Sequence, residues 1–159
     1  MNPYLVSILV PIFGVEKYIE RCAKSLFEQT YKNIEYIFVD DCSKDKSINL
    51  LEKVIKEYPE KKDYIKIIHH HTNRGLAAAR NTAIENSRGE FIMHVDSDDW
   101  IEKDAVEHLV NQQIKTCSDM VIGAAIIHRH SGNSVYYPIH TDNHWTLMDR
   151  TVDTQSFEC

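Results

Sequence analysis

The tripeptide Asp96-Ser97-Asp98 places two carboxylates one residue apart, directly after a short apolar run. Hard divalent cations such as Mg²⁺ and Mn²⁺ take oxygen ligands, commonly one or two carboxylates completed by water and substrate phosphates. A simpler interpretation is a solvated acidic turn ahead of a helix. A second acidic pair, Asp40-Asp41, also follows an apolar run, and this repetition favours a site for a cation and a phosphate-bearing ligand.

Two further features could contact a ligand, and each has a structural alternative. The pair Asp40-Asp41 either ends a strand ahead of a capped helix or accepts hydrogen bonds from a base or a ribose. Phe13 follows the first apolar run, and it is either a core residue or a wall for a flat ring. The residues alone leave both alternatives open.

The elements that must position these residues alternate along the chain. Short apolar runs predict strands over residues 5–11, 34–39, 64–69 and 90–95. Apolar residues at steps of three and four predict helices over residues 15–29, 76–87 and 104–113, and another from a cap at Ser43 or Asp45 to Pro59. This alternation predicts a Rossmann-like α/β fold, with an open, mainly parallel sheet and helices on both faces.

Parallel strands bring their carboxyl ends to one edge of the sheet, where ligands bind in such folds. The first strand would deliver Pro11 and Phe13 to that edge, and the third would deliver residues 69–75. The second and fourth strands would each deliver an acidic cluster. Charges of one sign placed together are costly unless they are compensated, so Mn²⁺ or Mg²⁺ is the expected cofactor.

The last part of the chain is less regular. Apolar residues predict one strand over residues 119–127 and another over residues 135–138. We expect an α/β domain over residues 1–127, followed by a less regular, acceptor-side region over residues 128–159. If the protein ends there, its apolar segments either pair with a second copy as a homodimer or fold back over the sheet edge.

Composition narrows the class of protein. The chain has 159 residues and a formal net charge of −6, which argues against nonspecific binding to nucleic acid. No apolar run approaches the roughly 20 residues that span a bilayer, and the first residues lack the basic stretch of a secretion signal. The four scattered cysteines form no Cys-x-x-Cys pair. We expect a cytoplasmic protein, with a peripheral position at the inner face of the membrane also open.

Three other signals carry less weight. His69-His70-His71 would alternate between the faces of a strand, so these side chains cannot share one ion. Four later histidines have ligand-like spacing, but no cysteine or carboxylate pattern joins them. No Gly-x-Gly-x-x-Gly motif occurs, and an aspartyl phosphatase would carry its Asp-x-Asp after the first strand.

Motifs spread over residues 4–104 resemble those of the family 2 glycosyltransferases, which have the A-type nucleotide-sugar-binding fold. The blocks that carry the resemblance are Val6-Ser7-Ile8-Leu9-Val10-Pro11-Ile12-Phe13, Glu16, Tyr18-Ile19, Ser25-Leu26-x-x-Gln29-Thr30-Tyr31, Val39-Asp40-Asp41-Cys42-Ser43-x-Asp45, Asn73-x-Gly75-x-x-x-Ala79-Arg80-Asn81, Gly89-Glu90-Phe91 and Asp96-Ser97-Asp98-Asp99-Trp100. Each block alone is weakly specific. The set in family order, with family spacing, is strongly specific.

The resemblance implies a metal-dependent, inverting transfer of a sugar from a nucleoside-diphosphate sugar, most often a UDP-sugar. The implied acceptor is a hydroxyl of a polysaccharide or a lipid-linked glycan. Asp41 would address the base, and the Asp-x-Asp motif would handle ribose, metal and diphosphate. The resemblance assigns nucleotide-sugar binding to Pro11, Phe13, Glu16, Asp41, Arg80, Asp96 and Ser97, and metal binding to Asp96 and Asp98.

This chain departs from the family pattern in two places. The family usually has Tyr-Asn where this sequence has Phe13-Gly14, so any polar contact from those side chains is lost. The family also carries an acidic general base on the acceptor side, and no late carboxylate here stands in a family context. The late carboxylates are Asp119, Asp142, Asp149, Asp153 and Glu158. We therefore expect either a transferase whose base lies beyond Cys159 or a noncatalytic nucleotide-sugar-binding remnant.

Overall fold

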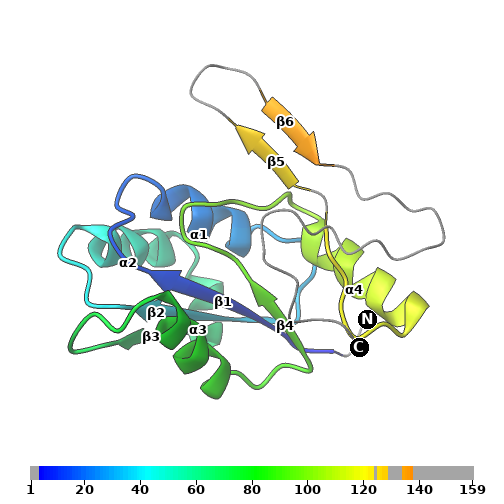
Figure 1. Ribbon diagram of the computed structural model, residues 1–159, viewed down its shortest axis with the longest axis horizontal. Coiled ribbons are helices and arrows are strands. Elements are labelled where there is room, and N and C mark those ends of the chain that lie inside the picture. Colours follow the sequence, from blue (N-terminus) through cyan, green and yellow to red (C-terminus); the bar gives the residue numbers. More distant parts are fainter. Residues whose placement is uncertain (1–3, 124, 129–133, 138–159) are drawn as a thin grey trace. The chain divides into compact units, whose positions relative to one another are not determined.

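A computed structural model describes residues 4–123, 125–128 and 134–137 of the chain. Four parallel strands form one open sheet in the order β3-β2-β1-β4 (Figure 1). The strands are β1 (Val6–Ile12), β2 (Ile34–Asp40), β3 (Ile65–His69) and β4 (Phe91–His94). The helices are α1 (Ile19–Phe27), α2 (Ser47–Glu57), α3 (Leu76–Glu85) and α4 (Ala105–Thr116), with a 3₁₀ helix, η1 (Pro59–Tyr64), after α2.

Helices cover both faces of the sheet, as the sequence predicts. Every residue of β1 and β2 is buried, which is typical of a parallel sheet between two helical layers. On one face, Leu9, Ile37 and Val39 pack against Ala79 and Ala83 of α3. Alanine side chains bring the helix close to the strands, so α3 lies tightly over β1 and β2.

The other face carries aromatic side chains. Phe27, the last residue of α1, contacts Tyr36 and Phe38 of β2 edge to face, with ring centroids 5.1 and 6.3 Å apart. The same ring lies 5.4 Å from Tyr58 at the end of α2. Strand residues of opposite parity point to opposite faces, so these rings lie opposite α3 and hold α1 and α2 on the sheet.

Some element boundaries differ from the sequence-based expectation. Helix α1 begins at Ile19 rather than near residue 15, because the carbonyl of Val15 accepts hydrogen bonds from the amides of Tyr18 and Ile19 and closes a turn first. After α2 the chain continues as η1, with Pro59 at its start, where a proline fits because its missing N–H is not needed.

Residues 119–123, expected to open a strand, carry no regular secondary structure. Strand β5 (Ala125–His128) begins later and pairs antiparallel with β6 (Ser134–Tyr137) in a separate two-stranded sheet. The chain divides into two compact units, Met1–Glu107 and His108–Cys159. The boundary expected after residue 127 stays a prediction.

A buried glutamine fixes the segment that follows β4. Gln29 is fully buried, and its amide donates hydrogen bonds to the carbonyls of Ser25 at 2.9 Å and Glu102 at 2.7 Å. Its Oε1 accepts a hydrogen bond from the amide of Val106 at 3.1 Å. One side chain thus joins the end of α1 to the start of α4. Among the described residues, no helix is long and apolar enough to cross a membrane.

Candidate functional site

A pocket of about 520 Å³ lies where the carboxyl ends of the strands meet. The structure brings six of the predicted site residues into its lining: Pro11, Phe13, Asp41, Asp96, Ser97 and Asp98. The pocket is also lined by residues to which the sequence assigned no role, Val15, Asn73, Gly75, Leu76 and Ala79 among them. Residues 73–75 follow the third strand, so their position in the chain was the available signal. Glu16 and Arg80 do not line the pocket.

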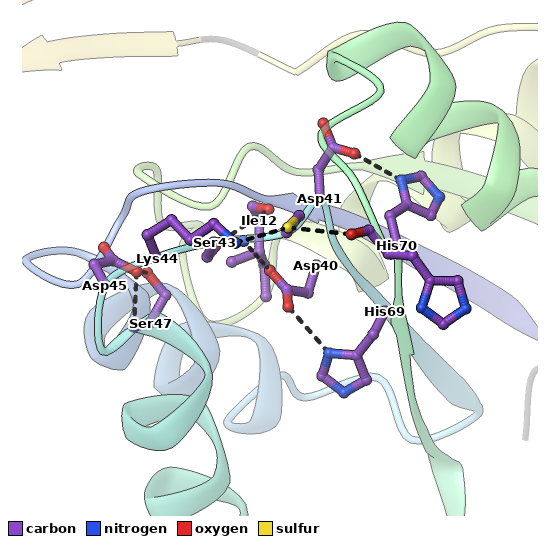
Figure 2. Close-up of polar contacts among 11 residues, drawn as sticks. Ile12, Asp40, Asp41, Ser43, Lys44, Asp45, Ser47, His69 and His70 are labelled. Carbon is purple, nitrogen blue, oxygen red and sulfur yellow. Dashed lines mark hydrogen bonds and ion pairs between the residues drawn. The ribbon is translucent and has the colours of Figure 1, made fainter.

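Asp41 is a buried carboxylate held by three donors at the pocket wall. Its Oδ1 accepts hydrogen bonds from His70 Nδ1 at 2.6 Å and from the amide of Arg74 at 2.8 Å (Figure 2 shows the bond from His70). Its Oδ2 accepts one from the amide of Gly75 at 2.7 Å. Burial alone raises the pKa of Asp41, but these hydrogen bonds outweigh burial and hold the pKa below its ordinary value. Asp41 is therefore an ionised acceptor.

The neighbouring aspartate points elsewhere. Asp40 Oδ2 lies 3.0 Å from His69 Nδ1, and Asp40 Oδ1 accepts a hydrogen bond from the amide of Ser43 (Figure 2). Asp40 does not line the pocket. Asp40 therefore shapes the turn after the strand, whereas Asp41 lines the pocket, and its contact with a base or a ribose stays a prediction.

Glu16 lies on the surface, where it joins two loops. Its amide donates a hydrogen bond to Asp45 Oδ2 at 2.9 Å, and its Oε2 accepts one from the amide of Lys46 at 3.1 Å. Asp45 Oδ1 in turn accepts hydrogen bonds from the amide and hydroxyl of Ser47. Glu16 thus supports the start of α2, and its contact with a nucleoside stays a prediction.

Arg80 contacts the Asp-x-Asp motif directly. Its Nη2 donates a hydrogen bond to Asp96 Oδ1 at 2.7 Å. Among the described residues, its Nε is a buried donor with no hydrogen-bond partner. Burial and the charge of Arg80 lower the pKa of His94, while Asp96 opposes them. Arg80 therefore supplies the cation that partly compensates this acidic cluster.

The acidic cluster keeps uncompensated negative charge. Asp98 is exposed and lines the pocket. Burial raises the pKa of Asp99, and the charges of Asp98 and Asp96 raise it further. Burial and the same three carboxylates raise the pKa of Cys22 to about 12. A bound divalent cation would relieve this repulsion.

The donor set fits a cation that also binds a ligand. The described residues hold no cluster of three or more His, Cys, Asp or Glu side chains able to enclose an ion. Asp96 and Asp98 supply two carboxylates at the pocket, and Mg²⁺ commonly uses that number with waters and substrate phosphates for the rest. The residues present therefore fit Mg²⁺ or Mn²⁺ together with a phosphate-bearing ligand.

Phe13 offers the pocket an aromatic surface. Its side chain is 56% exposed, so of its two sequence-based interpretations the core residue is wrong. Gly14 has a φ of +69°, a conformation that glycine and asparagine adopt more readily than other residues. This backbone requirement accounts for glycine at a position where the family usually has asparagine.

Comparison with known proteins identifies the family. The family model described as "Glycosyl transferase family 2" matches residues 7–158. Glycosyltransferase GlyA of Streptococcus pneumoniae is 37% identical over 96% of this chain and 22% of its own length. The putative glycosyltransferase EpsH of Bacillus subtilis is 46% identical over 75% of this chain and 32% of its own length. This chain thus spans about a fifth to a third of the length of these relatives.

Solved structures agree with the fold. Staphylococcus aureus TarS (residues 1–349), in complex with UDP, has a TM-score of 0.64 and 32% identity, covering 72% of this chain and 33% of that one. The mannosyltransferase PcManGT of Pyrobaculum calidifontis, in complex with GDP-Man and Mn²⁺, has a TM-score of 0.66 and 25% identity, covering 79% of this chain and 36% of that one. With its parallel sheet, its pocket at the carboxyl edge and these matches, the chain belongs to glycosyl transferase family 2.

Proposed function

We propose that this protein binds a nucleoside-diphosphate sugar in the pocket at the carboxyl edge of the sheet and transfers the sugar to a hydroxyl acceptor. The observation that carries the proposal is the meeting of three groups in one pocket: the aromatic ring of Phe13, the ionised Asp41, and the Asp96-Ser97-Asp98 turn. Complexes of similar structures with UDP, UDP-GlcNAc and GDP-Man support it.

The nucleoside would occupy the side of the pocket formed by Pro11, Phe13 and Asp41. A flat base packs on an aromatic ring, and an ionised carboxylate accepts a hydrogen bond from a ring N–H. Uracil offers such an N–H at N3, so a UDP-sugar is the proposed donor. The diphosphate would lie toward Asp96 and Asp98.

Asp96 and Asp98 would hold Mg²⁺ or Mn²⁺ against the diphosphate. When bound, the cation neutralises charge that develops on the leaving diphosphate. Arg80 keeps Asp96 Oδ1 oriented through its 2.7 Å hydrogen bond. Ser97, between the two carboxylates, is buried and lines the pocket, and we propose that it contacts the nucleotide sugar.

The transfer would invert the anomeric carbon. The acceptor oxygen forms its bond to that carbon from the side opposite the diphosphate, the bond to the diphosphate breaks, and a general base takes the hydroxyl proton. Asp142, Asp149, Asp153 and Glu158 lie outside the described residues, and Asp119 is in the second compact unit. The base is therefore not assigned.

The acceptor proposed from the family is a polysaccharide or a lipid-linked glycan, and the proposed location is the cytoplasm. The named glycosyltransferases among the relatives favour a transferase over a noncatalytic remnant. Since this chain spans 22% of GlyA and 32% of EpsH, catalysis by the whole protein is part of the proposal.

Calorimetry with a panel of nucleotide sugars, with and without Mn²⁺, tests donor binding. We expect Mn²⁺-dependent binding of at least one UDP-sugar, weakened at least tenfold by Asp98→Ala, because a carboxylate ligand is lost. Asp63→Ala is the matched control, since Asp63 is exposed in η1 and outside the pocket. Absence of Mn²⁺-dependent binding to every nucleotide sugar would contradict the proposal.

A further inference from the structure

The side chain of His70 is buried directly behind Asp41. The exposed fractions of the two side chains are 5% and 4%. His70 Nδ1 lies 2.6 Å from Asp41 Oδ1, and His70 Nε2 lies 3.0 Å from the hydroxyl of Thr82 in α3. His70 does not line the pocket. It therefore reaches any ligand there only through Asp41.

The chemistry of the two groups fixes the direction of the hydrogen bond between His70 and Asp41. An ionised carboxylate only accepts, so His70 Nδ1 carries a proton and donates it to Asp41. In the neutral imidazole Nε2 is then the acceptor, and the hydroxyl of Thr82 donates to it. The result is an ordered chain from α3 through the imidazole to the carboxylate.

A count of acceptor positions shows what remains for a ligand. A carboxylate has about four lone-pair positions, two on each oxygen. On Asp41, Oδ1 already accepts from His70 and Arg74, whereas Oδ2 accepts, among the residues that the structure describes, only from Gly75. One lone pair on Oδ2 is left for a ligand, and the direction in which it points depends on the rotation of the carboxylate about its bond to Cβ.

We propose that His70 is a positioning residue for the nucleobase. Its hydrogen bond fixes the orientation of the Asp41 carboxylate, and the free lone pair on Oδ2 then accepts a hydrogen bond from a ring N–H of the bound base. The inference rests on the proposed function and deepens it. A base with a ring N–H at that edge, such as uracil, is accepted. A ring nitrogen that carries a lone pair in the same place, as in cytosine, faces the carboxylate and is rejected.

A purely structural role for His70 gives a different expectation. Loss of His70 would then lower the melting temperature and weaken all nucleotides equally. If His70 acts through Asp41, its loss instead weakens the discrimination between two ligands that differ only at the ring N–H. The ratio of the Kd of N3-methyl-UDP to the Kd of UDP measures this discrimination.

Two conservative variants separate the two hydrogen bonds of His70. In His70→Asn, the side-chain amide nitrogen is as many bonds from the backbone as Nδ1, so a donor to Asp41 is kept. In His70→Gln, the side-chain amide lies near the position of Nε2, so the contact with Thr82 can be kept but the donor to Asp41 is lost. His69→Ala is the matched control, since His69 is paired with Asp40 outside the pocket. Melting temperatures identify any variant that does not fold.

Calorimetry of the purified protein with UDP and N3-methyl-UDP gives the result. We expect a wild-type ratio of roughly a hundredfold, retained by His70→Asn and His69→Ala and reduced about tenfold in His70→Gln. In an Asp41→Asn background, His70→Gln has no further effect, because the two residues act as a unit.

The outcomes separate the inference from the proposed function. If the wild type binds UDP and a folded His70→Gln keeps the full ratio, the inference is overturned and the proposed function stands. If His70→Asn and His70→Gln lose the ratio equally, a donor at the Nδ1 position is not the cause and the inference is overturned. If the wild type binds no nucleotide, the proposed function and the inference are both wrong.

Discussion

Arg80 Nη2 lies 2.7 Å from Asp96 Oδ1, so a protein cation contacts the same carboxylate that we propose as a metal ligand. Both side chains are partly exposed, at 37% and 46%, and solvent weakens such a pair. Arg80 can therefore share Asp96 with a divalent cation and a diphosphate, and it adds positive charge where two negative groups meet.

The first prediction concerns this pair. Arg80→Gln removes a positive charge from the acidic cluster, so Mn²⁺ binds the nucleotide-free protein more tightly, while UDP loses an attractive charge and binds more weakly. Electron paramagnetic resonance measures free Mn²⁺, and calorimetry measures UDP. Arg88→Gln is the control, because Arg88 pairs with Glu35 at the opposite edge of the sheet. Equal effects of both variants on Mn²⁺ would contradict the prediction.

The second prediction concerns Gln29. Gln29→Leu leaves the buried amide of Val106 without this partner and removes the hydrogen bonds to the carbonyls of Ser25 and Glu102. These losses lower the free energy of unfolding by about 2 to 4 kcal/mol. Urea denaturation measures the change. Gln112→Leu, at an exposed position of α4, is the control and stays within about 0.5 kcal/mol of the wild type.

The third prediction concerns Gly89, where the backbone meets β1. A Cβ at this position lies 2.6 Å from Ser7 Oγ and 2.7 Å from the Leu5 carbonyl oxygen. Gly89→Ala must displace backbone and lowers the free energy of unfolding by about 2 kcal/mol or more. A Cβ added at Gly123 contacts only Leu109 Cδ2, at 3.6 Å, so Gly123→Ala is the control. A large loss of stability in Gly123→Ala would contradict the steric explanation.

The fourth prediction is a pH dependence of stability. Burial raises the pKa of Glu35, but hydrogen bonds from Ser7 and from the amide and guanidinium of Arg88 outweigh it, so the net pKa is lowered. The unfolded state therefore binds the proton more readily, and stability rises with pH. The contribution is present above the unfolded pKa of about 4.3 and is lost as the pH falls through the folded pKa. Denaturation at a series of pH values measures the free energy of unfolding, which we expect to fall less steeply at acidic pH in Glu35→Gln than in the wild type. An unchanged slope in Glu35→Gln would contradict the prediction.

Self-association through the carboxyl-terminal segments stays a prediction for a protein that ends at Cys159. Light scattering after size exclusion measures the mass. A dimer that Val121→Lys converts to a monomer would place the contact there. A monodisperse monomer at high micromolar concentration would favour a chain that folds back on itself.

The strands were predictable because their burial is continuous. Each expected boundary of β1 and β2 lies within a residue of the structure, since a strand covered on both faces is apolar along its length. The meeting of the strand-end residues in one pocket was predictable for a related reason, because parallel strands end at one edge. The start of α1 was not, because a turn at Val15 uses the same apolar spacing as a helix.

The contacts behind the pocket were not predictable from the sequence. His70 was one of three consecutive histidines, and nothing local shows that it turns toward Asp41 and Thr82. Glu16 matched a family position, yet its carboxylate accepts from the Lys46 amide. Both contacts join segments far apart in the chain, and their geometry depends on the register of the sheet.

Glu35, Ser7 and Arg88 meet at the amino ends of the strands, where Glu35 Oε1 accepts hydrogen bonds from the Ser7 hydroxyl and the Arg88 amide. The pocket lies at the other ends of the same strands. Evolution can therefore vary the ligand-binding side chains while this distant network keeps the sheet intact. Substitutions in the pocket can therefore accumulate without loss of the contacts on which folding of the sheet depends.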